Sequence, residues 1–108
     1  MVGFDAFIDE FKEEVVNQAK ISFSDCPDAA VTDTYDAVNA VKNELKRWTT
    51  KMSQGSLTQD GFVALASAKK DKMEFKNLSQ TAVDPARTEQ FRQYLISLLI
   101  NRIIENFA

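Results

Sequence analysis

Hydrophobic residues recur at helical spacing from the start of the chain. Over residues 4–21 they follow one another at steps of three and four, as in Phe4, Phe7, Phe11 and Val15. Acidic residues occupy the positions between them. One apolar stripe opposite a charged face is typical of an amphipathic helix packed on a core. The pattern therefore predicts a first helix over residues 4–21.

The second segment, residues 27–53, has the most regular pattern in the chain. Apolar residues recur every seven positions, at Val31, Val38, Leu45 and Met52. A heptad spacing of this kind is typical of a long helix with a continuous packing seam. The segment opens with Pro27, and proline is well suited to a first helical turn because its missing N–H has no intrahelical partner there. We expect one helix over residues 27–53.

The third segment is predicted to be a helix over residues 57–78, although its apolar pattern is weaker. Gly55 suits a left-handed helix cap, and Ser56 followed by Gln59 has the form of a capping box. The connection to the preceding helix is short, so the two helices should run antiparallel. Gly61, inside the expected helix, indicates either close approach of a neighbouring helix or an irregular first turn.

The fourth segment, residues 85–107, is apolar on two opposite sides. It begins with a strong start signal, because Asp84 can cap a helix whose first residue is proline. At about 100° per residue, two stripes lie roughly opposite each other on this helix. One consists of Phe91, Leu95 and Leu98, and the other of Ile96, Ile100, Ile103 and Phe107, with Ile104 beside it.

These segments predict an all-α fold, a single-domain antiparallel four-helix bundle that occupies residues 1–108. The chain has 108 residues, which is the size of one domain, and only three glycines and two prolines. Sandwiches and barrels need turn residues far more often than this.

The second stripe of the fourth helix needs a surface that covers it, and three interpretations are open. The helix can be central and buried on both sides, which a regular bundle does not favour. The stripe can form the interface of a homodimer, in which two copies bury the same residues. It can also bind a different protein or a membrane surface, although the balanced charges of the helix argue against a membrane. We favour a homodimer interface formed by Ile96, Ile100, Ile103, Ile104 and Phe107.

Candidate catalytic chemistry is sparse. The chain has no histidine, which is the commonest general base and metal ligand, and a single cysteine. Cys26 is flanked by Asp25 and Asp28, which disfavour a thiolate. The three glycines form no phosphate-binding loop. We therefore expect no catalytic residues, no metal site and no cofactor, and we predict that the protein is not an enzyme.

Charge is unevenly distributed along the chain, whose formal net charge is −3. Residues 1–36 carry nine acidic and two basic residues, whereas residues 37–76 carry eight basic and four acidic residues. Lys69, Lys72 and neighbouring lysines are interrupted by acids, which is typical of a solvated helix face rather than a nucleic-acid site. No apolar run approaches the roughly 20 residues of a membrane span. Neither nucleic acid nor a transmembrane segment is expected, and a cytoplasmic location is the default.

Together these patterns predict a cytoplasmic, non-enzymatic helical-bundle protein that acts through protein–protein association. It would be a homo-oligomer, with a dimer favoured, or an accessory subunit of another protein. The alternative is a bundle with a ligand-binding or catalytic pocket between helices. Such a pocket would need a cavity among Phe11, Val38, Trp48 and Met73.

Overall fold

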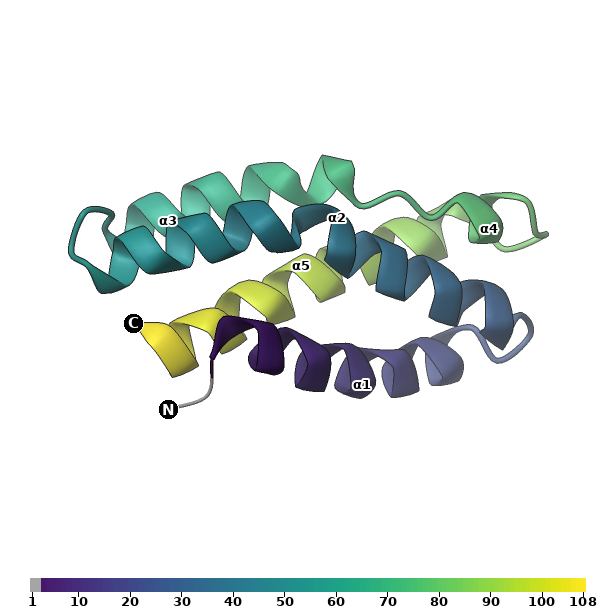
Figure 1. Cartoon of the computed structure of the whole chain (residues 1–108). Coiled ribbons are helices and arrows are strands. Elements are labelled where there is room, and N and C mark those ends of the chain that lie inside the picture. Colours follow the sequence, from purple (N-terminus) through teal and green to yellow (C-terminus); the bar gives the residue numbers. More distant parts are fainter. Residues whose placement is uncertain (1–2) are drawn as a thin grey trace.

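The computed structural model describes residues 3–108, which form helices joined by turns and contain no β-strand. Three of the predicted helices are confirmed to within one residue: α1 (Phe4–Ser22), α2 (Pro27–Ser53) and α5 (Pro85–Phe107). The molecule is elongated, with extents of 45 × 25 × 18 Å. α1 packs against α2 more extensively than any other two helices within residues 3–108 do, and α3 lies beside the C-terminal part of α2 (Figure 1).

The ends of the helices follow local sequence signals. Pro27 and Pro85 each occupy the first helical turn, as predicted. The Asp84 side chain accepts a hydrogen bond from the N–H of Ala86 at 2.9 Å and so caps α5. After α2, Gly55 has a φ of +79°, the left-handed conformation that glycine adopts without steric cost.

The predicted third helix is wrong as a single element. Residues 57–78 contain α3 (Gln59–Ser67), the 3-10 helix η1 (Ala68–Lys72), an extended stretch, and the single-turn α4 (Lys76–Ser79). The predicted cap at Ser56 is also wrong, because the hydroxyl of Thr58 accepts the capping hydrogen bond from the N–H of Gly61. Gly61 is closely approached: an added Cβ would lie 2.9 Å from the side chain of Leu57.

The burial of Met73 and Phe75 explains why the helical segment does not continue past Lys72. Met73 and Phe75 are both buried. In a continuous helix these two residues would project about 200° apart, whereas an extended backbone sends residues i and i+2 to the same side. The backbone is extended at Met73, with φ −80° and ψ 96°. The alternation of polar and apolar residues in KMEFK is the sequence signal for this break.

A buried carboxylate holds the next turn in place. Asp33 of α2 is buried and accepts hydrogen bonds from the backbone N–H groups of Asn77 and Leu78, at 3.2 and 2.7 Å. It also accepts one from the amide side chain of Asn77, at 2.9 Å. The first N–H groups of a helix lack intrahelical acceptors, so Asp33 serves as a cap that is supplied by a distant helix.

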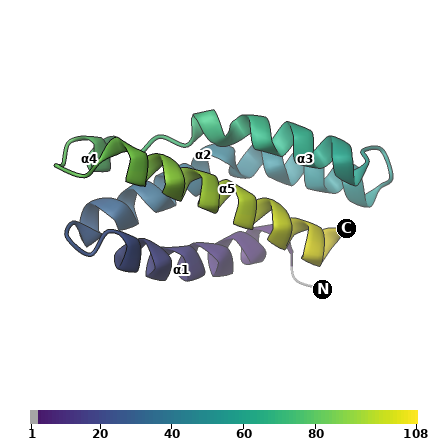
Figure 2. The same ribbon diagram turned by 180° about the vertical axis from the view of Figure 1, so that it is seen from behind.

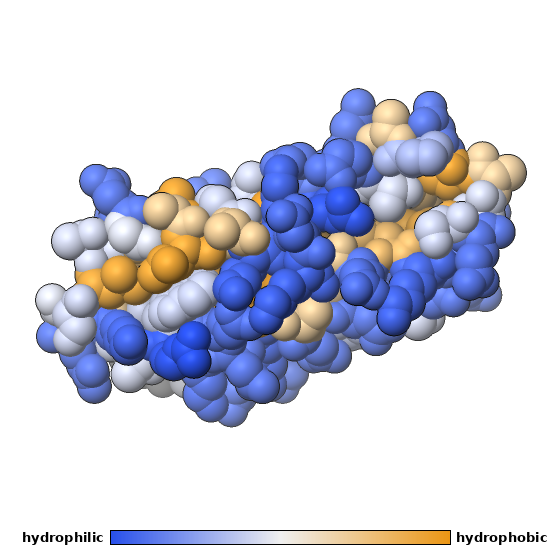
Figure 3. All heavy atoms as spheres, turned by 90° about the horizontal axis from the view of Figure 1, so that it is seen from above, coloured by the Kyte–Doolittle hydropathy of each residue, from blue (hydrophilic) through white to orange (hydrophobic). Residues whose placement is uncertain are grey.

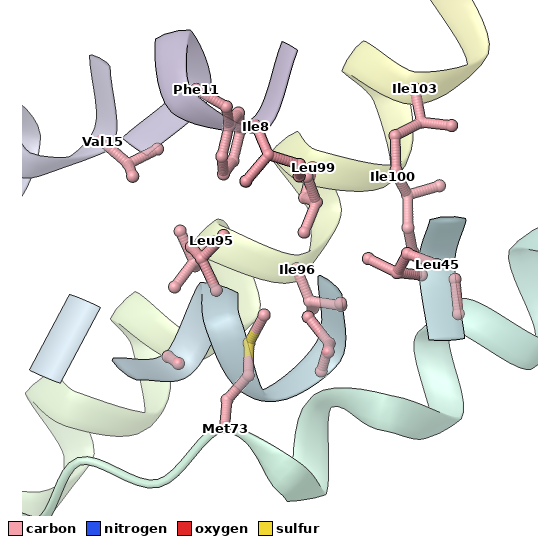
Figure 4. Packing of buried hydrophobic residues seen from close by; sticks show 14 of the residues in the cluster. Ile8, Phe11, Val15, Leu45, Met73, Leu95, Ile96, Leu99, Ile100 and Ile103 are labelled. Atoms are coloured by element: carbon pink, nitrogen blue, oxygen red, sulfur yellow. The ribbon is translucent and has the colours of Figure 1, made fainter. Parts of the chain in front are cut away.

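The core lies around α5, which crosses between α1 and the α2–α3 pair (Figure 2). α5 contacts α1, α2, α3 and η1. Leu99 points toward Ile8 of α1, while Ile100 lies beside Leu45 of α2 (Figure 4). Side chains that project about 100° apart from α5 therefore enter the same hydrophobic core.

Candidate interaction surface

The predicted interface on α5 divides into buried and half-buried residues. Ile96, Ile100 and Ile103, which we call the isoleucine stripe, are 3 %, 6 % and 0 % exposed. Ile104 and Phe107 are half-buried and pack against the core. An interface between folded chains needs side chains that reach the surface. The contact predicted at the isoleucine stripe is therefore corrected: these three residues belong to the core of the chain itself.

The isoleucine stripe is covered by the helices that pack against α5. Our expectation assumed that the neighbours of the last helix would lie on one side of it. Instead, α1 lies on one side of α5 and the α2–α3 pair on the other (Figure 2). The stripe is therefore buried within the chain itself, but α5 is not buried all round, because Tyr94, Ser97 and Asn101 lie on an exposed face of the helix. A partner contact at Ile104 and Phe107 stays a prediction.

The end of α5 is fixed by aromatic and polar contacts. The ring of Phe107 lies 5.7 Å from that of Phe4 and 5.4 Å from that of Phe7, measured between centroids. The hydroxyl of Ser53 donates a hydrogen bond to the carbonyl of Phe107 at 3.2 Å. One turn earlier, Arg102 forms a two-armed ion pair with Glu14 of α1, at 3.1 and 2.6 Å.

A different apolar surface is exposed on α3. Val63 and Leu65 are 37 % and 39 % exposed, two of the five large hydrophobic side chains that are exposed among residues 3–108. Ala64, Ser67 and Ala68 are exposed as well. We call these five residues the α3 face, in which Val63 and Leu65 lie at the two edges, about 200° apart around the helix, and the small residues lie between them. Hydrophobic side chains gather over the α3 end of the molecule in Figure 3.

The α3 face contains no charge, unlike the surfaces around it. Residues 61–68 include no acidic or basic residue, while Asp60 precedes them and Lys69 and Lys70 follow. The outer side of α1, by contrast, exposes Asp5, Asp9, Glu10, Glu13 and Glu14. We missed the α3 face in the sequence because we interpreted residues 57–78 as one helix with a weak apolar pattern. The uncharged run GFVALASA was the signal that could have revealed it.

Positive charge collects where α3 passes into η1. Lys69 and Lys72 both form ion pairs with Glu44 of α2, at 2.6 and 2.5 Å. Hydrogen bonds from these two lysines lower the pKa of Glu44 from 4.5 to about 2. The ammonium of Lys69 also lies 5.7 Å from the centre of the Trp48 ring. These contacts fix the lysines against α2, which fits the expectation of a charged helix face.

A groove of about 560 Å³ lies at the opposite end of the same face, between α4 and α5. Figure 3 shows it as a hollow with a hydrophobic floor. Phe75, Leu78 and Val83 are among its lining residues. Its rim charges pair with each other, Lys76 with Glu74 and Arg92 with Glu89. The predicted pocket residues Phe11, Val38, Trp48 and Met73 are buried core residues and do not line this groove.

Three further expectations concern a metal site, the single cysteine and a membrane-spanning helix. No group of three or more histidine, cysteine or acidic side chains within residues 3–108 is arranged to hold a metal ion. Cys26 is half-buried, with its thiol 3.9 Å from the carboxylate of Asp25. Across the same residues, no helix combines the length and apolarity needed to cross a membrane.

Comparison with known proteins gives no relative: no family model, no curated protein and no solved structure matches this chain.

Proposed function

We propose that this protein acts by associating with another protein chain, and that the α3 face is the surface of contact. The supporting observation is the exposure of Val63 and Leu65 on one nine-residue helix without intervening charge. Isolated exposed hydrophobic side chains are ordinary, whereas a contiguous apolar patch with a charged rim marks an interaction surface. Asp60 and Lys70 supply such a rim at the two ends of the patch.

In this proposal the remainder of the fold is a support for α3. We interpret α1, α2, α3 and α5 as an irregular four-helix bundle in which α5 contacts each of the other three helices. Because the isoleucine stripe is covered by the chain itself, it contributes stability rather than recognition. We do not favour the alternative of a ligand-binding or enzymatic bundle, because the residues expected to line its cavity are packed in the core.

Site-specific photocrosslinking in living cells tests the proposal. A photoreactive phenylalanine analogue replaces Ala64, at the centre of the α3 face. The matched control places the same analogue at Glu13, which is equally exposed but lies on the acidic side of α1. We expect a discrete crosslinked product of defined mass from position 64 and none from position 13. Absence of a product at position 64, with normal expression and folding, contradicts the proposal.

A further inference from the structure

We propose that the groove between α4 and α5 binds a small molecule that is uncharged and mainly apolar. The groove has a volume of about 560 Å³, and small-molecule sites usually measure about 300–1,000 Å³. It is separate from the α3 face, so this inference does not depend on the proposed function. It is also separate from the cavity between helices that the sequence led us to expect, because the residues of that cavity are packed in the core.

The floor of the groove is made of hydrophobic side chains. Phe75 and Leu78, from the α4 side, are 4 % and 1 % exposed and close the bottom of the groove. Val83 is half-buried and Pro85 is exposed, so these two leave apolar surface in contact with water. A ligand with an apolar body would cover that surface, and its burial favours binding.

Both walls of the groove are fixed by contacts within the chain itself. On the α4 side, Asp33 accepts hydrogen bonds from the backbone N–H groups of Asn77 and Leu78. On the α5 side, the Nε of Arg92 donates a hydrogen bond to the carbonyl of Met73 at 3.0 Å, which ties α5 to the extended stretch before α4. A site that is already formed loses less conformational entropy when a ligand binds.

The charged side chains on the rim select for an uncharged ligand. Lys76 pairs with Glu74 at 3.2 Å, and Arg92 pairs with Glu89. The lining residues thus carry two positive and two negative charges. A charged ligand would find no excess of the opposite charge, and it would lose part of its hydration against the apolar floor. The charge balance of the groove therefore complements a neutral molecule.

A hydroxyl group on the α5 wall can orient such a molecule. Thr88 is half-buried and lines the groove, and its hydroxyl can donate or accept a hydrogen bond. The hydroxyl of Ser79, on the α4 wall, already donates to the carbonyl of Lys76 at 2.7 Å. The groove therefore suits an apolar body that carries one hydrogen-bonding group.

Titration with indole, followed by amide chemical shifts in NMR, is the first test. Indole is uncharged and mainly apolar, and it carries one N–H donor. Its shifts should concentrate at Leu78, Val83 and Thr88 and should saturate in the millimolar range. Indole-3-acetate and tryptamine carry the same ring with a negative and a positive charge, and each should bind about threefold more weakly or worse. Equal affinities for the three probes, or no saturable shifts in the groove, overturn the inference.

Two aspartate variants locate the site of indole binding. Val83→Asp places a charge on the groove and should weaken indole binding about tenfold or more. Val63→Asp makes the same change on the α3 face and is the matched control, which should leave indole binding unchanged. Thr88→Val keeps the shape of the wall and should weaken binding about threefold through loss of the hydroxyl. Equal losses from the two aspartate variants overturn the inference, because indole would then not be specific to the groove.

A further variant tests the selection for a neutral ligand. Glu89→Gln removes the carboxylate partner of Arg92 and leaves one excess positive charge on the rim. Indole-3-acetate should then bind about threefold more tightly than it binds the wild type, and salt should reduce this gain. Glu105→Gln, near the other end of α5, is the matched control and should have no effect. An unchanged affinity for indole-3-acetate in Glu89→Gln overturns the assignment of a neutral ligand.

A segment of another protein is the alternative occupant, and photocrosslinking in cells distinguishes it. The photoreactive phenylalanine analogue is placed at Ser79, which is exposed on the rim. A protein crosslinked from position 79 overturns this inference and leaves the proposed function intact. A protein crosslinked from position 64 but not from position 79, together with saturable indole binding, supports both proposals. Saturable indole binding without a crosslink at position 64 contradicts only the proposed function.

Discussion

The isoleucine stripe of α5 and the α3 face are both apolar, yet the fold covers the first and leaves the second in contact with solvent. The stripe is covered because α5 crosses between α1 and the α2–α3 pair, so helices lie on both of its sides. α3 lies at the edge of the molecule, with α2 and α5 as its main helical neighbours. The comparison teaches that the position of a helix in the fold decides whether an apolar stripe serves the core or a partner.

The largest expected effect tests the comparison directly. Ile103→Asp should lower the free energy of unfolding by about 4 kcal/mol or more, since it buries a carboxylate without a partner. Leu65→Asp should cost less than about 1 kcal/mol, because solvent reaches that side chain. Chemical denaturation monitored by circular dichroism measures both. Equal losses of unfolding free energy for the two variants would show that Leu65 is as deeply buried as Ile103, which contradicts the comparison.

A second prediction concerns the break that ends α3 and η1. Asp33→Ala should lower the free energy of unfolding by about 2–3 kcal/mol, because three donors lose their buried acceptor. Asp33→Asn keeps one acceptor oxygen and should cost less. Amide hydrogen exchange at Asn77 and Leu78 should accelerate in the alanine variant before exchange in α2 does. Unchanged exchange at these two amides would show that Asp33 does not hold α4.

A smaller effect separates two buried threonines of α2. The hydroxyl of Thr34 donates a hydrogen bond to the carbonyl of Ala30 at 2.7 Å, whereas the hydroxyl oxygen of Thr49 has no partner within the described chain. Thr49→Val should therefore raise the free energy of unfolding by about 1 kcal/mol, and Thr34→Val should lower it by a similar amount. Thermal unfolding of both variants measures the difference, and a loss in both would indicate that Thr49 is satisfied.

The smallest expected effect is the pH dependence of the contact between α2 and η1. The pKa of Glu44 is lowered from 4.5 to about 2 by Lys69 and Lys72. A carboxylate with a depressed pKa stabilises the folded state above its unfolded pKa, and this contribution is lost as the pH falls toward its folded pKa. Between pH 4.5 and 2, the wild type should therefore lose more stability than Glu44→Gln. High salt should reduce the difference, since Lys72 is exposed and solvent also reaches the half-buried Glu44 and Lys69.

The helical nature of the chain and the bounds of α1, α2 and α5 were determined by local patterns. Periodicity, Pro27, the Asp84–Pro85 pair and Gly55 act over a few residues, so they can be interpreted without knowledge of the fold. The break after Ser67 depended on contacts distant in sequence. Met73 and Phe75 share one core, and Asp33 reaches Asn77 and Leu78 from 44 and 45 positions away. Of these two causes, the sequence near the break shows only the first, as the alternation of polar and apolar residues in KMEFK. The hydrogen bonds from Asp33 leave no local signal.

The sequence by itself established that the last helix carries two apolar stripes and that the third segment has an uncharged run. Which of them faces solvent was decided by the tertiary structure alone. A stripe specifies that a helix will bury one side, but it does not specify whether the neighbour that covers it belongs to the same chain or to another. That choice follows from the path of α5 across α1, α2, α3 and η1, which sets the isoleucine stripe in the core and leaves α3 at the edge.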